Sequence, residues 1–168
     1  DVIGISLTFL SLQPAIGPMI ATLKMNYPNV PIVVGGSFPS LLPDHIAHIN
    51  GIDYVVAGEG EVAFPLLLKA IEDKKEPSGI AGVYYKRDEQ IVGTLPERIT
   101  DLDSIPYPAY DLVTLDQYFS VQGVRRIQLI TSRGCPFNCR FCSVPLTSKR
   151  KWYGHSPERV LVELEGAA

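Results

Sequence analysis

The residues best suited to chemistry are three cysteines, Cys135, Cys139 and Cys142, which stand in the spacing C-x-x-x-C-x-x-C and are the only cysteines of the 168-residue chain. They follow an apolar run at 127–131 that is typical of a buried strand. Thiolates bind zinc and iron–sulfur clusters, so three of them within eight residues indicate a metal site. An odd number of clustered thiols argues against a secreted disulfide framework and favours a reducing, cytoplasmic compartment.

Three kinds of site are compatible with these thiols. Structural zinc needs four protein ligands, and His155 is the candidate for the fourth, which would make the chain a zinc-stabilised, non-catalytic binding module. A redox-active pair of Cys139 and Cys142 would leave Cys135 without a role. The remaining hypothesis is an iron–sulfur cluster that is held by three thiolates and keeps one iron open for a substrate or cofactor.

The segment T-S-R-G-C-P-F-N-C-R-F-C-S, with Phe141 just before the last cysteine, resembles the signature of radical S-adenosylmethionine (SAM) enzymes. The resemblance implies that Cys135, Cys139 and Cys142 hold a 4Fe-4S cluster and that Phe141 packs near the adenine of SAM. It also implies reductive cleavage of SAM to methionine and a 5′-deoxyadenosyl radical, a small-molecule substrate, and a reductant such as a flavodoxin or ferredoxin. The implied fold is a TIM-type (β/α) barrel that begins in residues 126–168, with the cluster loop after its first strand.

The N-terminal part of the chain alternates strand-like and helix-like segments. The strand-like runs are apolar throughout, as in parallel sheets that are covered on both faces. They lie at 2–6, 32–34 and 53–57. Helical spacing is found at 14–27, where a helix is expected to start near Pro18, and at 43–49 and 64–71. The sequence therefore predicts a flavodoxin-like or Rossmann-like α/β domain, followed by a hairpin at 83–92.

Glycines follow two of the expected strands, at Gly35-Gly36 and at 58–60, where open α/β sheets bind ligands. Ser6-Leu-Thr8 and Gly35-Gly36 resemble part of the cobalamin-binding fingerprint D-x-H-x-x-G, S-x-L and G-G, although Thr8 stands where Leu is usual. The resemblance implies that Ser6, Thr8, Gly35 and Gly36 line the slot for the nucleotide tail of cobalamin. The histidine segment of the fingerprint is expected before Asp1.

Together the two resemblances point to the family of radical SAM enzymes with a cobalamin-binding domain. Residues 1–95 would be the cobalamin-type domain without its first strand and helix, 96–125 a linker, and 126–168 the start of the radical domain. The chain would then be a fragment of a methyltransferase or of an oxidative cyclase. The alternative within the family is a radical enzyme whose α/β domain is vestigial and binds no cobalamin.

The remaining features indicate ordinary structure. The net charge of −3 gives no reason to expect nucleic acid, and no apolar run of 18 residues indicates a membrane span. His45 and His48 are expected on an exposed helix surface, and Glu59 and Glu61 near a helix start, where acids are favourable. Ser156-Pro157-Glu158 predicts a further helix start, with the apolar side chains that follow facing inward.

Overall fold

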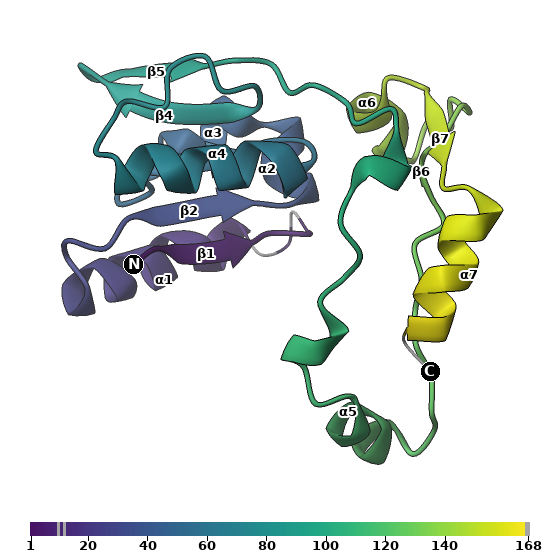
Figure 1. Cartoon of the computed structure of the whole chain (residues 1–168). Coiled ribbons are helices and arrows are strands. Elements are labelled where there is room, and N and C mark those ends of the chain that lie inside the picture. The colour runs from purple at the N-terminus through teal and green to yellow at the C-terminus, as the bar shows by residue number, and fades with distance from the viewer. Residues whose placement is uncertain (10, 12, 167–168) are drawn as a thin grey trace. The chain divides into compact units, whose positions relative to one another are not determined.

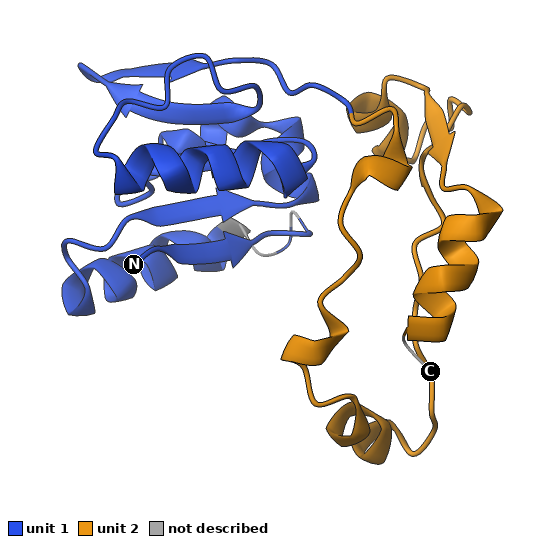
Figure 2. Cartoon of the chain, in the orientation of Figure 1, with its two compact units in different colours: residues 1–98 blue, residues 99–168 orange. Residues whose placement is uncertain are grey.

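The computed structural model describes residues 1–166 other than 10 and 12. The chain forms two compact units, residues 1–98 and residues 99–168 (Figure 2), and each is described by itself. Among the described residues, no helix combines the length and the apolar character that crossing a membrane requires. The prediction of domains at 1–95 and 126–168 with a linker between them stays a prediction.

The first unit is built on one five-stranded sheet in the order β1-β2-β3-β4-β5 (Figure 1). Its strands are β1 (Ile3–Ser6), β2 (Ile32–Gly35), β3 (Tyr54–Val56), β4 (Val83–Arg87) and β5 (Gln90–Gly93). The first three strands are parallel, which confirms the predicted α/β fold, and β3, β4 and β5 are antiparallel neighbours. The predicted hairpin therefore extends the sheet, because its first strand pairs with β3.

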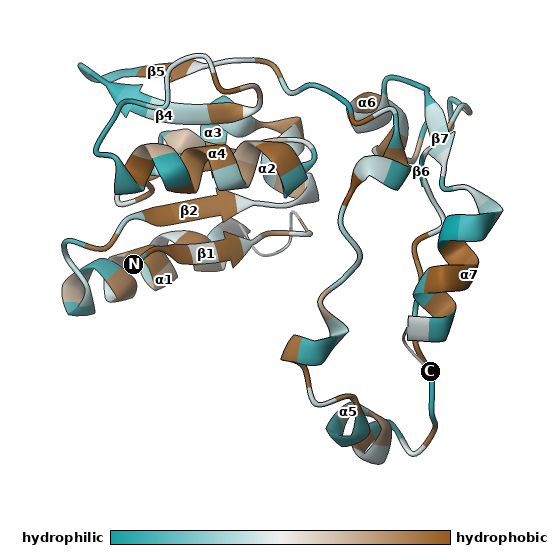
Figure 3. Cartoon of the chain, viewed as in Figure 1, coloured by the Kyte–Doolittle hydropathy of each residue, from teal (hydrophilic) through white to brown (hydrophobic). Residues whose placement is uncertain are grey.

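Helices cover both faces of this sheet. They are α1 (Gln13–Asn26), α2 (Ser37–Leu41), α3 (Pro43–Ala47) and α4 (Gly60–Glu72). One core forms between the sheet and α1, α2 and α3, and a second, smaller core forms under α4. Figure 3 shows the apolar colouring of β2, the central strand of the parallel part, which contributes to both cores. Burying each Val, Leu or Ile side chain contributes roughly 1.5–3 kcal/mol.

One helix prediction was wrong in detail, and one short helix was not predicted. The first helix begins at Gln13 and contains Pro18 instead of starting near it. Pro18 is the sixth residue of α1, so the helix lacks the hydrogen bond that an amide at this position would donate to the Pro14 carbonyl oxygen. The helix expected at 43–49 is present as α3, which ends at Ala47, and a second short helix, α2, precedes it. Leu42 lies between the two helices with a non-helical backbone of φ −136° and ψ 58°.

The second unit contains shorter elements. They are 3₁₀ turns at Leu102–Ser104 and Tyr110–Leu112, then α5 (Leu115–Gln122), β6 (Ser132–Gly134), α6 (Val144–Ser148), β7 (Trp152–Gly154) and α7 (Pro157–Gly166). β6 and β7 pair in antiparallel register, with Gly134 opposite Trp152. The strand expected at 127–131 was wrong, because those residues find no partner strand among the described residues. Only Thr131 accepts a backbone bond, at 2.9 Å from the amide nitrogen of His155.

Candidate functional site

The first candidate site is a pocket at the carboxyl ends of the parallel strands. Ser6 ends β1, Gly35 ends β2, and Ser6 lies directly opposite Gly35 in the ladder. Open α/β sheets bind ligands at this edge. The pocket has a volume of about 580 Å³, which lies within the range of small-molecule sites. It is lined by Gly4, Ile5, Ser6, Val33, Gly35, Gly36, Val56, Gly58, Gly60, Glu61, Phe64 and Pro65.

Glycines keep this pocket open. Gly36 has φ +106°, and a Cβ atom there would lie 2.6 Å from the carbonyl oxygen of Leu7, so this turn tolerates no side chain. A Cβ atom on Gly4 would have no neighbour within 4 Å, because it would point into open space. The backbone of β1 is therefore accessible to a bound molecule at Gly4, next to the hydroxyl group of Ser6.

Three of the four residues predicted to contact cobalamin meet in this pocket. Ser6, Gly35 and Gly36 line it together, whereas Thr8 is not among its lining residues. The carbonyl oxygen of Thr8 instead accepts a hydrogen bond of 3.0 Å from Ser37 Oγ, which holds this loop against the start of α2. Gly4 was missed by the sequence analysis, although its spacing of two from Ser6 on one strand places both on the same face of the sheet.

Glu59 lies between two glycines of the pocket wall and precedes α4. Its carboxylate is 3.7 Å from the guanidinium of Arg98, and the two side chains are 12% and 20% exposed. Such a half-buried pair restrains the turn that leads into α4. The acid therefore has a partner in addition to the helix start, which was the predicted contact.

The second candidate site is the loop that follows β6. Cys135, Cys139 and Cys142 are free thiols, and the Cys142 amide donates a 3.2 Å hydrogen bond to the Cys139 carbonyl oxygen. The buried hydroxyl of Ser148 donates to the Cys135 carbonyl oxygen at 3.3 Å. Within the described residues, no three His, Cys, Asp or Glu side chains gather closely enough to hold a metal ion. The three thiols thus lie on one loop, but their sulfur atoms do not point to a common centre.

The surroundings of the loop fit an iron–sulfur cluster. The segment 117–157 contains seven Lys or Arg residues and no Asp or Glu, so its positive charge suits an anionic cluster. Phe141 is 94% exposed, and its ring is accessible to a ligand. The imidazole of His155, the candidate fourth zinc ligand, is 7% exposed and lies 3.1 Å from an Asp103 oxygen through Nδ1.

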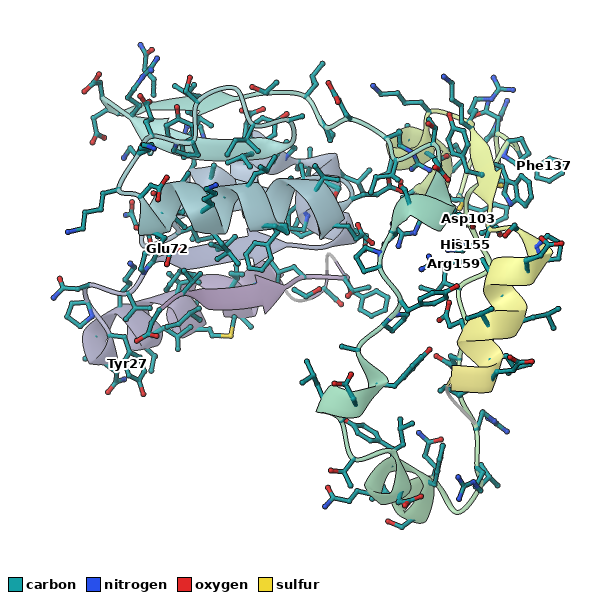
Figure 4. All side chains as sticks on the ribbon, in the orientation of Figure 1. Tyr27, Glu72, Asp103, Phe137, His155 and Arg159 are labelled. Carbon is teal, nitrogen blue, oxygen red and sulfur yellow. The ribbon has the colours of Figure 1, made fainter. Side chains whose placement is uncertain are left out.

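Asp103 anchors a segment, residues 101–112, that we call the strap. Both carboxylate oxygens of Asp103 accept hydrogen bonds from the Ser156 amide, at 3.1 and 3.3 Å. The hydrogen bonds from Ser156 and the neighbouring His155 lower the pKa of Asp103. Arg159 Nη1 donates to the Asp103 carbonyl oxygen at 2.9 Å, and the Arg159 guanidinium lies 3.8 Å above the Tyr107 ring. Figure 4 shows Asp103, His155 and Arg159 together at the start of α7.

The strap also contacts the next turn of α7. Tyr110 donates a 3.0 Å hydrogen bond to Glu163 Oε1, and burial together with this bond raises the pKa of Tyr110. α7 therefore buries Arg159 and Glu163, whereas Leu161 and Leu164 are 58% and 46% exposed. The expectation that these apolar side chains face inward was wrong, because the strap presents polar groups to this helix.

The predicted start of α7 is confirmed. Ser156 Oγ accepts a 3.1 Å hydrogen bond from the Arg159 amide, as an N-cap does, and the helix begins at Pro157. The strap and this cap together fix α7 and, through its neighbour β7, the ribbon that leads into Cys135.

The chain is similar to several known proteins. The B12 binding domain family matches residues 1–68. The chain is 39% identical to the uncharacterized methyltransferase PH0819 of Pyrococcus horikoshii, over 98% of this chain and 36% of that protein. It is 35% identical to an anaerobic magnesium-protoporphyrin IX monomethyl ester cyclase of Synechocystis, over 79% of this chain and 27% of that protein.

A solved structure with the same fold is that of the cobalamin-dependent S-adenosylmethionine radical enzyme OxsB with aqua-cobalamin bound. It aligns with a TM-score of 0.75 and 25% identity over 98% of this chain and 23% of OxsB. The chain thus spans about a third or less of the length of the proteins it matches.

Proposed function

The chain belongs to the family of radical SAM enzymes that carry a B12-binding domain, and from this premise we propose that the protein is a cobalamin-dependent radical enzyme. It cleaves SAM reductively to methionine and a 5′-deoxyadenosyl radical, which activates a small-molecule substrate. The observation that carries the proposal is that one chain combines a pocket at the carboxyl ends of its parallel strands with a loop of three free thiols.

The pocket of the first unit is the proposed cobalamin site. Gly35 and Gly36 leave the sheet edge bare, and Gly4 leaves the face of β1 open, so a large ligand can lie directly on the backbone. Ser6 offers a hydroxyl group that can donate or accept a hydrogen bond at the same place. When bound, cobalamin supplies a cobalt centre that can carry a methyl group.

The loop of the second unit is the proposed cluster site. Cys135, Cys139 and Cys142 act as thiolate ligands, and the exposed ring of Phe141 packs against the adenine of SAM. When bound, a 4Fe-4S cluster supplies the electron for SAM cleavage and an open iron for the amino and carboxylate groups of SAM. Ser148 and the strap hold the ends of this loop.

Methyl transfer is the first candidate reaction, because a relative that matches nearly the whole chain is named a methyltransferase. Oxidative ring formation is the second, because another relative is named an ester cyclase. A cytoplasmic location, where thiols stay reduced, suits the proposed cluster.

Anaerobic reconstitution of the full-length protein with iron and sulfide tests the proposal. A brown chromophore, a reduced-cluster EPR signal that changes when SAM is added, and formation of 5′-deoxyadenosine are expected. Stoichiometric zinc without a chromophore would instead support the zinc-stabilised module.

A spectroscopic titration with hydroxocobalamin distinguishes a cobalamin-dependent radical enzyme from one whose α/β domain binds no cobalamin. Saturable binding of one equivalent is expected. SAM cleavage by a protein that binds no cobalamin would support the vestigial α/β domain.

A further inference from the structure

One serine side chain of α2 contacts both of the glycine turns that border the pocket of the first unit. Ser40 Oγ donates a 2.7 Å hydrogen bond to the carbonyl oxygen of Gly36, which follows β2. The same oxygen accepts a 2.8 Å hydrogen bond from the amide of Gly58, which comes after β3. A hydroxyl group has one donor and can accept as well, so both bonds form together. We call this pair of hydrogen bonds the serine bridge.

The serine bridge lies just beyond the end of a sheet ladder. β2 and β3 are parallel neighbours, and their last paired residues are Gly35 and Val56. Beyond this pair the two chains turn at Gly36 and Gly58, which have φ values of 106° and 83°. Both glycines line the pocket, whereas Ser40 is not among its lining residues. The serine side chain therefore joins two walls of the pocket at a place that the backbone ladder does not reach.

The amide of Gly58 does not need this bond to avoid being buried without a partner. Gly58 is exposed, so water can accept a hydrogen bond from its amide. The carbonyl oxygen of Gly36 has a second donor, because the Ser40 amide also donates to it at 3.2 Å. A side-chain bond between groups that have other partners changes where the turns lie more than whether they are satisfied. The serine bridge is thus a geometric restraint on the two turns.

The residues before Ser40 give the serine bridge a fixed base. Phe38 and Pro39 are both buried, and Phe38 belongs to the larger core of the first unit. The Phe38 amide also donates a 3.1 Å hydrogen bond to the carbonyl oxygen of Leu7. Because protein cores are close-packed, α2 cannot shift without disturbing these contacts. The Ser40 hydroxyl is therefore held at a defined place from which it positions the turns.

The turn at Gly58 is also restrained by residues 96–98. A Cβ atom on Gly58 would lie 2.6 Å from Cβ of Pro96, so the proline packs closely against this turn. The carboxylate of the next residue, Glu59, lies 3.7 Å from the guanidinium of Arg98. These contacts attach the turn to the segment that follows β5. Its attachment to the turn after β2 is the bond from Gly58 to Ser40.

We propose that Ser40 is a positioning residue for cobalamin, because the serine bridge fixes the separation of the two glycine turns before the ligand enters. This inference rests on the proposed function, in which the pocket binds cobalamin. A site that is correctly formed only part of the time binds with an affinity reduced by that fraction. One net hydrogen bond changes such an equilibrium by roughly 2- to 12-fold. Loss of the serine bridge is therefore expected to weaken cobalamin binding by this factor.

The test compares the unmodified full-length protein with three variants. Ser40→Ala removes the serine bridge, and Ser40→Thr keeps a hydroxyl group at the same position. The matched control is Thr22→Ala in α1, where Thr22 Oγ1 donates a 2.9 Å hydrogen bond to the Pro18 carbonyl oxygen four residues earlier. Ser40 donates to Gly36 over the same spacing, but none of the described residues of α1 lines the pocket. The control thus removes a similar bond away from the site.

Each protein is prepared without cobalamin, and urea unfolding confirms that it is folded under the assay conditions. Hydrogen exchange, followed by mass spectrometry on peptides that cover 56–62, reports on the turn at Gly58. Titration with hydroxocobalamin gives the affinity and the visible spectrum of the bound form. We expect Ser40→Ala to exchange faster at this turn and to bind hydroxocobalamin roughly 2- to 12-fold more weakly. The spectrum should be unchanged because Ser40 acts through the turns, and Ser40→Thr and Thr22→Ala should match the unmodified protein.

Unchanged affinity or unchanged exchange in Ser40→Ala would overturn the proposal. An equal loss of affinity in Ser40→Thr would also overturn it, because the effect would then come from packing around α2 and not from the hydroxyl group. A changed spectrum would place Ser40 against the ligand and so contradict its action through the turns. Failure of the proposed function is distinguishable, because the unmodified protein would then show no saturable binding, while the exchange comparison would still decide whether Ser40 holds the turns.

Discussion

Replacing Gly4 with valine is expected to block cobalamin without disturbing the fold. Gly4 lies in β1, lines the pocket and shares its face of the sheet with Ser6. A Cβ atom at this position meets no other atom within 4 Å, and the backbone of Gly4 has no positive φ. The Gly4→Val change therefore adds three carbon atoms to the pocket without a clash against the protein.

The expected magnitudes have opposite signs for folding and for binding. A β-branched residue in place of a strand glycine adds up to about 1 kcal/mol of stability. A ligand that packs against this strand must shift to accommodate the new side chain, and such overpacking costs about 1–3 kcal/mol. That penalty corresponds to a loss of affinity of roughly 5- to 150-fold.

The assay is a titration of the full-length protein with hydroxocobalamin, followed by visible absorption, alongside urea unfolding. The control is Gly17→Ala in α1, where a Cβ atom also meets nothing within 4 Å. This control should gain up to about 1 kcal/mol of stability and bind cobalamin unchanged. If the Gly4→Val protein unfolds at the same or higher urea concentration and still binds cobalamin with unchanged affinity, the pocket is not the cobalamin site.

Three further predictions concern the second unit. Cys139→Ser should lose most of the reconstituted iron and the brown chromophore while keeping cobalamin binding, and a retained EPR signal would remove Cys139 from the ligand set. The pKa of Asp103 is lower in the folded protein than its ordinary value of 3.8. The carboxylate therefore stabilises the fold at pH values above 3.8, and this stabilisation is lost as the pH falls through the pKa of the folded state. Hydrogen exchange of the α7 amides should therefore accelerate in acid, and Asp103→Asn should abolish this dependence; an unchanged pH profile would contradict the anchoring role of the Asp103 carboxylate. Tyr110→Phe should cost about 1 kcal/mol through the lost bond to Glu163, measured by urea unfolding with Tyr118→Phe as the control.

The parts of the fold that depend on local pattern were predictable from the sequence. Val33 and Val34 lie in a run of β-branched residues that only a strand covered on both faces accommodates, and the structure buries both. Gly35 and Gly36 end that strand, so their place at the ligand-binding edge follows from topology alone. The same reasoning extended to Gly4 would have completed this wall of the pocket.

The parts that depend on distant contacts were not predictable in this way. The apolar run at 127–131 has the composition of a strand, but strand pairing needs a neighbour that composition does not specify. The burial of Arg159 depends on Tyr107 and Asp103, about fifty residues earlier in the chain, and helical periodicity contains no such information. Helical periodicity therefore predicted an interior position for Leu161, whereas the structure exposes this side chain.

The strap has a consequence for the order in which the chain folds. Its bonds join residues 52, 53 and 56 positions apart, whereas the sheet of the first unit pairs strands that follow one another in sequence. Closing a loop of this length costs more chain entropy than closing the shorter loops of the sheet, so we expect the contacts of the strap to form after the sheet. Cys135, Cys139 and Cys142 lie inside this loop, between Asp103 and His155. Their thiols therefore gain a fixed frame only when the loop closes, and a metal centre delivered before that step meets an unstructured segment.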